Sequence, residues 1–333
     1  MIKSINNNII ISEYILKNTN GISVNILSYA GVIKEINIPN KNNKFENIVL
    51  SYKNNEQYLT DDFFIGALIG RYANRISNGR FKLNKNVIQL DQNEKNNHLH
   101  GGNNGFHKNN WELEEYDEQD QSFVKLKFYS KHLDGGYPGN LKTTVVYTLT
   151  QKNELIIEFY AKSDKDTIYN PTSHSYFNLC PSSNSILKHK LKINAEKYIP
   201  INSQYIPFGK LEWLKNTPFD FSSEKEIGKE IKSDNKQLKI GSGYDHCFVL
   251  NKNNLSAEIS DVISGRKVII STDQPAIHLY SGNHLKGKFM KNEGVCLETQ
   301  HFSDSPNNLN FPTTLLKANK EFYTKTTYSF SLI

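Results

Sequence analysis

The stretch TTVVYTLTQKNELIIEFYA, from Thr143 to Ala161, holds two runs of β-branched and aromatic residues on either side of a polar break. Along both runs, the apolar residues recur with the two-residue period of a strand that buries one face. The break between them, TQKNE, has the length and composition of a hairpin turn. This segment therefore predicts two neighbouring antiparallel strands.

The same pattern recurs along most of the chain. Further runs of this kind are GISVNILSYAGVIKEINI (21–38), FVKLKFYS (123–130), LKHKLKINAEKYI (187–199), AEISDVISGRKVIISTD (257–273) and TTYSFSLI (326–333). A second turn signal, ISGRKV, divides the fourth of these runs. Only the segment from Ser222 to Leu238, SSEKEIGKEIKSDNKQL, predicts a short helix. Many strands and little helix predict an all-β fold, a large antiparallel β-sandwich.

The length and charge of the chain limit its organisation and its partners. The 333 residues contain no repeat of fixed period and no linker, so we expect a single domain over residues 1–333. There are 40 basic and 34 acidic residues, and the resulting net charge of +6 is spread thinly along the sequence. No basic stripe interleaved with aromatic residues is present, so we expect no nucleic-acid partner.

Cysteine usage and the N-terminus predict a cytoplasmic protein. Cys180, Cys247 and Cys296 are odd in number and far apart, and no two of them form a CxxC pair. The N-terminal stretch MIKSINNNIIISEY has an apolar run of only three residues, too short for the core of a signal peptide. No apolar stretch reaches the length of a membrane span. Whether the protein is a monomer or a homodimer stays open.

Arginine is rare in this lysine-rich chain, and its distribution is uneven. Arg71, Arg75 and Arg80 lie together in GRYANRISNGR (70–80), and Arg266 is the only other arginine. Lysine does not reproduce the planar fork with which arginine holds two oxygens at once. The cluster therefore indicates a bidentate contact with a carboxylate or with paired hydroxyls. Chance clustering and an internal salt bridge are the alternatives.

Two histidines precede a pair of glycines in NNHLHGGNNGF (96–106). If this segment is a strand, His98 and His100 point to the same face, which suits metal binding, proton transfer or sugar binding. The glycines indicate a sharp turn, or a close approach of something to the backbone. A metal-binding barrel would carry a glutamate a few residues later, and none follows here. We therefore expect no metal.

Three further segments contain candidate functional groups. His174 lies among serines in NPTSHSYFNL (170–179), where a buried structural histidine is the alternative. Asp245 precedes an apolar strand in GSGYDHCFVL (241–250), where a turn residue is the alternative. That segment lacks the third glycine of a dinucleotide site. Glu298 interrupts an apolar strand in GVCLETQ (294–300), so it faces either solvent or a pocket that raises its pKa. Alternation alone does not decide between the two.

Five of these motifs, in order, carry a resemblance to a known family. GRYANRI, NNHLHGG, NPTSHSYFNL, GYDH and CLETQHFSDSPN together resemble the aldose 1-epimerase, or galactose mutarotase, family over nearly the whole chain. The resemblance implies a large antiparallel β-sandwich. It also implies interconversion of the α and β anomers of free aldohexoses, such as glucose and galactose, without a cofactor.

The resemblance also implies roles for individual residues. By motif, Glu298 matches the general base, His174 the general acid, and His100 a group that binds the sugar near its ring oxygen. Contacts to the sugar are implied for Asn74, Arg75, Ser175, Tyr176, Asp245 and His278. His278 departs from the pattern, because other family members carry a glutamine there, and this puts the substrate preference in doubt.

Two other functions stay open for a chain of this kind. An epimerase for a phosphorylated hexose would need a basic phosphate-binding cluster, for which Arg71 and Arg80 are available. A non-catalytic carbohydrate-binding protein would keep the sandwich and lose the chemistry, although both proton-transfer residues are present here. His98 has no assigned role in any of these functions.

Overall fold

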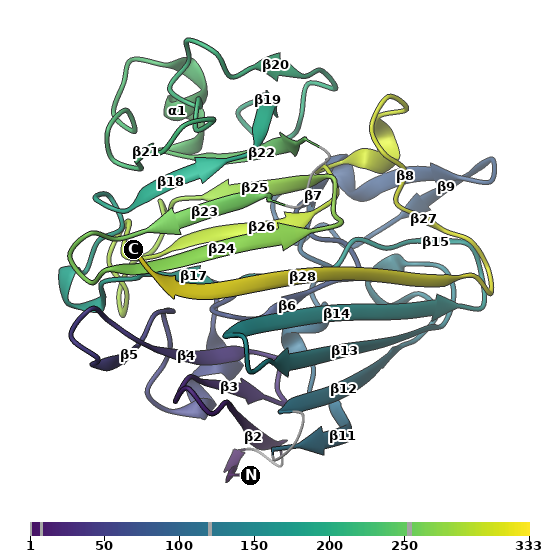
Figure 1. The fold of residues 1–333 in the computed structure, drawn as a ribbon. Helices are drawn as coiled ribbons and strands as arrows, with labels where there is room; N and C mark the ends of the chain where they lie inside the picture. The colour runs from purple at the N-terminus through teal and green to yellow at the C-terminus, as the bar shows by residue number, and fades with distance from the viewer. Residues whose placement is uncertain (1, 7–8, 119–121, 252–254) are drawn as a thin grey trace.

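The computed structural model describes residues 2–6, 9–118, 122–251 and 255–333, and strands dominate this part of the chain (Figure 1). Within these ranges every pairing between strands is antiparallel. The helical segments of the described residues are one α-helix and six short 3-10 helices. They are α1 (Lys236–Gly241), η1 (Asn55–Thr60), η2 (Ser77–Gly79), η3 (Phe106–Lys108), η4 (Asp134–Gly136), η5 (Pro181–Ser183) and η6 (Ser305–Asn307). None of them has the length and apolar character needed to span a bilayer.

The largest sheet of the described chain has nine strands and contains both predicted hairpins. Its strands, in spatial order, are β11 (Glu112–Asp117), β12 (Phe123–Ser130), β13 (Leu141–Leu149), β14 (Glu154–Ser163), β28 (Glu321–Leu332), β24 (Arg266–Thr272), β23 (Ala257–Ser260), β18 (Lys190–Ile193) and β21 (Lys225–Glu226). The first hairpin joins β13 to β14, with Val145 opposite Phe159 and Leu149 opposite Leu155. The second joins β23 to β24. Both turn predictions are confirmed.

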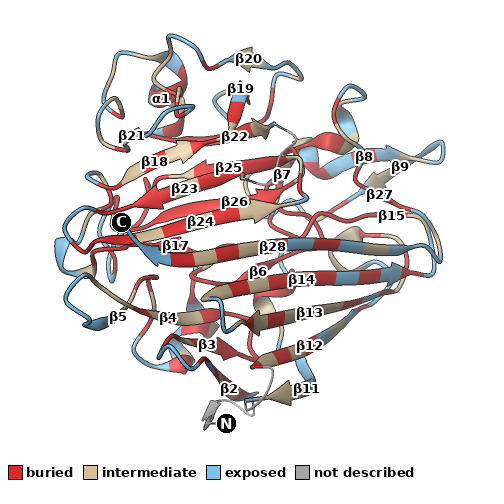
Figure 2. Cartoon of the chain, viewed as in Figure 1, coloured by how far each residue is buried: buried red, intermediate tan, exposed pale blue. Residues whose placement is uncertain are grey.

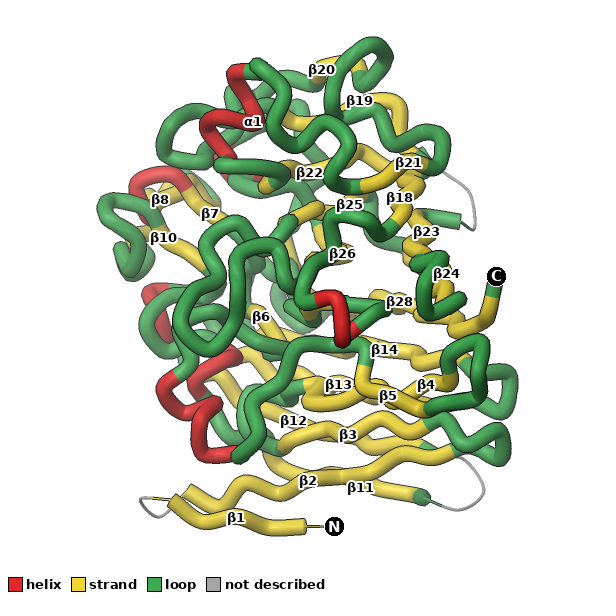
Figure 3. The backbone as a smooth tube through the Cα atoms, turned by 90° about the vertical axis from the view of Figure 1, so that its left-hand side faces the viewer, coloured by secondary structure: helices red, strands yellow, loops and turns green. Residues whose placement is uncertain are grey.

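A second sheet of six strands carries most of the residues that matter for chemistry. Its order within the described residues is β17 (Tyr176–Phe177), β26 (Val295–Gln300), β25 (Ala276–Tyr280), β22 (Asp245–Leu250), β19 (Ala195–Ile199) and β20 (Glu212–Trp213). Turned by a quarter, the molecule shows β25 and β26 on one side and β23 and β24 on the other (Figure 3). The two sheets therefore face each other as the layers of a sandwich.

The remaining strands form a five-stranded sheet and four short two-stranded ladders. The five-stranded sheet, in the described part of the chain, is β1 (Ile2–Asn6), β2 (Ile9–Lys17), β3 (Ser23–Leu27), β4 (Ile33–Pro39) and β5 (Phe45–Asn47). The ladders pair β6 (Leu68–Ile69) with β16 (Thr172–Ser173), β7 (Arg75–Ile76) with β10 (His98–Leu99), β8 (Arg80–Leu83) with β9 (Asn86–Gln89), and β15 (Thr167–Ile168) with β27 (Leu315–Leu316).

Alternation along the strands builds the core. On β14, Leu155, Ile157 and Phe159 are buried, whereas Tyr160 is exposed, and Figure 2 shows the resulting change of colour from residue to residue. A single apolar cluster joins the inward side chains of all three large sheets, and it reaches from Tyr14 to Phe330. The all-β sandwich is confirmed. The single-domain organisation stays a prediction, although this shared core supports it.

The helix predicted from Ser222 to Leu238 is wrong over most of its length, because α1 begins only at Lys236. Part of the preceding stretch hydrogen-bonds to another segment of the chain, and the rest forms turns. The backbone N–H of Ile227 donates to the carbonyl of His189, and that of Gly228 donates to the carbonyl of Leu187. These bonds continue the edge strand β21 (Lys225–Glu226) beside β18. The apolar residues of this segment are spaced as in a helix, but most of the segment is not helical.

The three cysteines behave as the sequence predicted for a reduced protein. Cys180, Cys247 and Cys296 are all buried, and none forms a disulfide. Burial raises the pKa of the Cys247 and Cys296 thiols. Both thiols are therefore protonated and unreactive at neutral pH.

Candidate active site

A cavity of about 400 Å³ lies beside β22, β25 and β26 of the six-stranded sheet. Loops and short ladders from the first third of the chain complete its walls. Its polar and ionisable lining includes Asp62, Asn74, Arg75, Glu94, His100, His174, Tyr176, Asp245, His278, Tyr280, His284, Lys286 and Glu298. The lining brings together all but one of the residues predicted from the family motifs, Ser175 being the exception.

Glu298 enters the cavity because its neighbour on β26 belongs to the core. Leu297 is buried in the apolar cluster between the sheets, so strand alternation turns Glu298 to the opposite face. His278 on β25 lies directly opposite Glu298 in the register, and Asp245 on β22 lies opposite Tyr280. Three adjacent strands thus supply a row of polar side chains. This settles what alternation in the sequence left open, and Glu298 is 2% exposed.

His174 approaches Glu298 from the segment between β16 and β17. Pairing of Tyr176 on β17 with Cys296 on β26 brings the two segments together. The Nε2 atom of His174 lies 3.9 Å from Oε1 of Glu298, and its Nδ1 lies 3.5 Å from the Cys296 sulfur. The other carboxyl oxygen of Glu298 has no hydrogen-bond partner among the described residues. The pair is close enough for both groups to reach one ligand, and neither is tied to the other by a short bond.

Burial shifts the pKa values of this pair in opposite directions. Desolvation raises the pKa of Glu298 well above its ordinary value, and the nearby charge of Asp245 adds to the increase. Desolvation also lowers the pKa of His174 to about 4. These directions favour a protonated Glu298 and a neutral His174.

Asp245 has the opposite character to Glu298, although both carboxyls are buried. Burial would raise its pKa, but the hydrogen bond and charge of His278, together with the charge of Arg75, hold the pKa below its ordinary value. The Nε2–H of His278 donates to Oδ1 of Asp245 at 2.6 Å. Asp245 is therefore an ionised acceptor, suited to hold a hydroxyl, whereas Glu298 is suited to exchange a proton.

His100 does not lie on a strand, and in this respect the sequence-based prediction for His98 and His100 is wrong. Strand β10 ends at Leu99, and His100 takes a left-handed backbone with φ of 51°. The two glycines that follow also have positive φ. A Cβ on Gly101 would fall 1.8 Å from the carbonyl oxygen of Gly70, so the close approach predicted there is made by backbone.

The chain fixes the proton position on His100. The backbone N–H of Asn74 donates to Nδ1 of His100 at 3.2 Å. Burial holds the pKa of His100 well below its ordinary value, so the ring is neutral and its single proton sits on Nε2. His100 is therefore a hydrogen-bond donor toward a ligand in the cavity.

His98 is instead a structural residue outside the cavity. Its Nδ1–H donates to the carbonyl of Asp91 at 2.8 Å, and its Nε2 accepts from the Tyr137 hydroxyl at 2.6 Å. Both ring nitrogens are thus used inside the protein. Burial lowers the pKa of His98 to about 4. These contacts anchor the strand that ends just before His100.

The SDSPN segment holds Asn74 in place. The Ser303 hydroxyl donates to Oδ1 of Asn74 at 2.9 Å, and the backbone N–H of Asp304 donates to the carbonyl of Arg75. The amide nitrogen of Asn74 lies 3.4 Å from both ring nitrogens of His278. Asn74 therefore presents its N–H₂ group to the cavity beside His278.

Arg75 makes its two-point contact with a carboxylate of the protein. Its Nε and Nη2 donate to the two carboxyl oxygens of Glu94 at 2.7 and 2.6 Å, and its guanidinium stacks 4.6 Å from the ring centre of Tyr205. Of the alternatives left open by the sequence, the ion pair is the one observed. The remaining nitrogen, Nη1, is the donor left for a ligand.

The other arginines do not reach the cavity. Arg71 is 2% exposed, and its guanidinium donates to the carbonyls of Ser130, Lys131 and Pro138 and to the Ser130 hydroxyl. Arg266 is likewise buried and paired with Glu46. Ser175 also lies outside the lining, with its hydroxyl 3.3 Å from that of Ser173.

Comparison with known proteins agrees with this arrangement. A model of the family described as aldose 1-epimerase matches residues 12–329. The aldose 1-epimerase of Haemophilus influenzae is 34% identical over 328 residues, which cover 95% of this chain and 94% of that protein. Human galactose mutarotase is 34% identical over 321 residues, with 93% and 91% covered. The chain belongs to the aldose 1-epimerase family.

Solved structures extend the likeness to three dimensions. The crystal structure of a galactose 1-epimerase from Lactobacillus acidophilus is 30% identical, with a TM-score of 0.90 over 99% of this chain and 98% of that one. An aldose epimerase homologue from C. elegans is 27% identical, with a TM-score of 0.91 over 97% and 99%. The fold predicted from the family motifs is confirmed, and the protein is an isomerase.

Several cavity residues of this aldose 1-epimerase homologue escaped the sequence analysis, and Phe64 and Glu94 contact the predicted groups directly. The ring of Phe64 lies 4.7 Å from that of His100 and 5.7 Å from that of His174, so it desolvates both. Nothing in the sequence DDFF (61–64) indicates that Phe64 lines the cavity. Glu94 lies in a polar, asparagine-rich stretch of the sequence. A carboxylate there, six residues before His100, was the available signal for a partner of Arg75.

One set of side chains in the site has the composition of a metal site. Ligand atoms of His100, His174 and Glu298 lie within 4.8 Å of one another. A metal-bound histidine ordinarily donates its other ring N–H to an oxygen. Nδ1 of His100 instead accepts from the Asn74 N–H, which leaves the proton on Nε2, the atom a metal would need. The set therefore fits a hydrogen-bonding role better, and independence from metal stays a prediction.

Arg75→Lys should raise KM for the sugar by about tenfold and change kcat less, because a lysine keeps the charge but loses the fork held by Glu94 and the stacking on Tyr205. The measurement is initial-rate kinetics over a range of substrate concentrations. Arg80→Lys, on the exposed start of β8, is the matched control. An unchanged KM in Arg75→Lys would assign Arg75 to structure alone.

Proposed function

We propose that the cavity interconverts the α and β anomers of free aldohexoses, glucose and galactose among them, by acid and base catalysis of ring opening and closure. The observation that carries the proposal is the Glu298–His174 pair, whose facing atoms lie 3.9 Å apart in a buried cavity. The surrounding donors and acceptors suit a polyhydroxylated ring. The family membership supports the reaction type.

Glu298 and His174 together can take up and supply the protons that this reaction moves. Ring opening moves the proton of the anomeric hydroxyl to the Glu298 carboxylate, while His174 in its imidazolium form gives a proton to the ring oxygen. The products are protonated Glu298, neutral His174 and the open aldehyde. Ring closure runs the same transfers in reverse after the aldehyde turns about the C1–C2 bond. The pair holds one proton before and after each step, so no net exchange with solvent is needed.

Burial favours one of these two protonation states. Because desolvation raises the pKa of Glu298 and lowers that of His174, the resting pair is in the form that follows ring opening. The sugar must therefore help to stabilise the ionised form. His100 as an Nε2–H donor, Nη1 of Arg75 and the carboxylate of Asp245 are placed to hold the remaining sugar oxygens during this exchange.

The test is an anomerisation assay. Fresh α-galactose and fresh α-glucose are followed separately by polarimetry, with the spontaneous rate subtracted. The proposal expects both sugars to equilibrate faster with the protein and expects equal acceleration from the β side. Acceleration of neither sugar would contradict it.

The pH dependence of kcat/KM, which reports the ionisation of the free enzyme, should be a broad plateau with two limits. Below about pH 4, His174 gains a proton while Glu298 keeps its own, so no base remains and kcat/KM falls. As the pH rises through the elevated pKa of Glu298, the pair loses its single proton, and kcat/KM falls again. The measurement is kcat/KM at each pH, from rates at low sugar concentration after subtraction of the buffer-catalysed rate. A fall centred on pH 6.5, the ordinary histidine value, would contradict the assigned protonation states.

The two other functions have less support. The arginines that favoured a phosphorylated substrate, Arg71 and Arg80, are absent from the cavity lining. A non-catalytic binding protein would not need a buried histidine and carboxyl 3.9 Å apart, and the closeness of His174 and Glu298 therefore favours an enzyme. We infer further that the protein acts in the cytoplasm on a small sugar, as a monomer or a homodimer. Buried free cysteines support the cytoplasmic location.

His278→Gln should leave anomerisation intact and change the ratio of glucose to galactose efficiency several-fold. His278 lines the cavity and orders Asp245 through a 2.6 Å hydrogen bond, and a contact to one hydroxyl discriminates sugars that differ at that carbon. The measurement is kcat/KM for both sugars in both proteins. Identical ratios would place His278 away from the hydroxyls that differ.

A further inference from the structure

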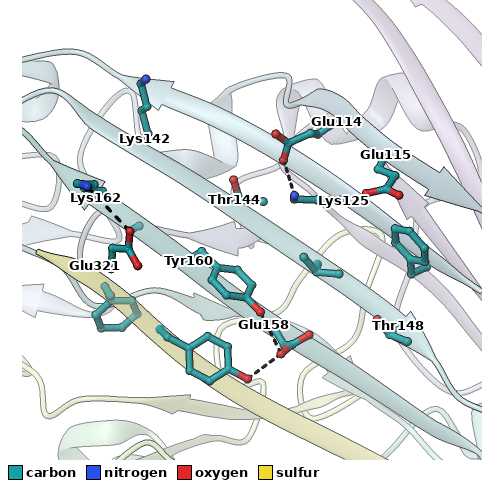
Figure 4. Close-up of a pocket in the computed structure, with 15 residues that line it drawn as sticks. Glu114, Glu115, Lys125, Lys142, Thr144, Thr148, Glu158, Tyr160, Lys162 and Glu321 are labelled. Carbon is teal, nitrogen blue, oxygen red and sulfur yellow. Dashed lines mark hydrogen bonds and ion pairs between the residues drawn. The ribbon is translucent and has the colours of Figure 1, made fainter. Parts of the chain in front are cut away.

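The outer face of the nine-stranded sheet carries a second hollow, of about 720 Å³ (Figure 4). Side chains of β11, β12, β13, β14 and β28 line it, and none of them lines the active-site cavity. These side chains alternate with core residues, as Tyr160 does with the buried Phe159. The outer-sheet hollow is therefore a separate feature of the molecule.

Two tyrosines form a fixed aromatic platform in this hollow. Tyr160 and Tyr323 lie opposite each other in the register of β14 and β28, with ring centres 5.0 Å apart. They are 41% and 49% exposed. Both hydroxyls donate to Oε1 of Glu158, at 3.3 and 2.7 Å. The shared carboxylate holds the rings in place while their faces stay open. Such tyrosines give a large contact area at a low entropy cost.

The polar groups around the platform favour a neutral ligand. The lining contains three lysines and four glutamates, so the two signs nearly cancel. Lys125 pairs with Glu114 at 3.1 Å, and Lys162 lies 3.9 Å from Glu321. A nucleic acid or another polyanion would require a net positive surface. These groups instead offer hydrogen-bond donors and acceptors on both sides of the rings.

The shape of the hollow favours an elongated, convex occupant. It crosses five neighbouring strands, which at about 4.8 Å between strands gives a breadth of roughly 19 Å. In a symmetric dimer formed through this face, the two hollows would face each other and enclose unfilled space, whereas stable interfaces are closely packed.

We propose that the outer-sheet hollow binds a neutral carbohydrate chain, whose C–H faces stack on Tyr160 and Tyr323. Its hydroxyls bond to the surrounding lysine, glutamate and threonine side chains.

Affinity electrophoresis on native gels tests this proposal with soluble starch, β-1,4-galactan and mixed-linkage β-glucan as probes. Borohydride reduction of the probes removes their reducing ends, and saturating galactose occupies the catalytic cavity. The variants of Tyr160 and Tyr323 then distinguish binding at the outer-sheet hollow from binding in the catalytic cavity, whatever the outcome for the proposed function. We expect at least one probe to retard the protein.

Paired variants locate the binding. Tyr160→Ala with Tyr323→Ala should weaken retardation about tenfold or more, as loss of two aromatic anchors does, and leave kcat and KM for α-galactose unchanged. Each single alanine variant should show part of the loss, so a failure of the double variant to fold leaves the question answerable. Trp213→Ala removes another exposed aromatic side chain, on β20 of the other sheet, and should bind as the wild type does.

Three results would overturn the proposal. The first is no retardation by any of the three probes. The second is retardation that persists in both single variants and in the double variant. The third is a wild-type dimer, measured by light scattering, that the alanine variants dissociate, because the hollow would then be an interface between two copies of the chain.

Discussion

Glu298→Gln should lower kcat by a factor of about 10²–10⁴, the range usually supplied by one proton-transfer group. Glutamine keeps the shape of the side chain and loses the base. The reason to expect the full effect is the setting of Glu298, which is buried at 2% exposure, 3.9 Å from His174, with its other oxygen unpartnered. Asp245, the nearby buried carboxyl, has a lowered pKa and is held by His278, and Glu94 is held by Arg75. No neighbour can therefore take over the role.

A stability measurement separates loss of chemistry from loss of folding. A carboxyl whose pKa is raised in the folded state binds more protons folded than unfolded between its two pKa values, so ionisation lowers the free energy of unfolding as pH rises through that interval. Glutamine removes this penalty. Glu298→Gln should therefore show a higher Tm than the wild type, and the difference should grow with pH above the ordinary glutamate value. Sugar binding by calorimetry should persist. Turnover near the wild-type level would refute the assignment of the base.

Local patterns in this sequence predicted the fold because most of its strands pair with their neighbours in sequence. The hairpin from Thr143 to Ala161 is readable since each strand meets the next across a short turn. The conformation of the segment from Ser222 to Leu238 could not be predicted in this way, because backbone N–H groups within it donate to the carbonyls of Leu187 and His189. Apolar residues at helical spacing fit both a helix and the conformation observed here. Contacts with a segment distant in the sequence decide between the two.

The site was predictable to the extent that its residues stand in motifs. Glu298 was marked as a carboxylate inside an apolar strand, yet its direction depended on the packing of Leu297 between two sheets, which alternation does not give. The scarcity of arginine pointed to Arg75 and to a bidentate partner. It did not say that this partner is Glu94, since an ion pair between residues nineteen positions apart leaves no periodic trace in the sequence.

The histidine pair shows a different limit of sequence reasoning. Treating His98 and His100 as strand residues placed them on one face, but His100 lies in a left-handed turn. Its backbone conformation is supported by the glycines beside it and by the Asn74 N–H that reaches its ring. The protonation state of the ring follows from that one hydrogen bond. Residue type and spacing alone therefore predicted the functional group but not the state in which it acts.

His174→Asn should lower kcat by the same order as Glu298→Gln, about 10²–10⁴, because asparagine keeps a polar group near Cys296 and removes the atom that faces Glu298. Asn74→Ala, which removes a hydrogen-bonding group elsewhere in the same cavity, is the matched control and should raise KM more than it lowers kcat.

The double variant Glu298→Gln, His174→Asn decides whether the two residues act as one unit. In the mechanism proposed above, each transfer needs its partner, since one proton leaves the sugar for Glu298 while another reaches the sugar from His174. A unit broken by one change loses little more by a second, so the double variant should retain nearly the activity of either single variant. Independent contributions would instead multiply. The measurement is α-galactose anomerisation above the spontaneous rate for all four proteins, and a multiplicative loss would show that acid and base act in separate steps.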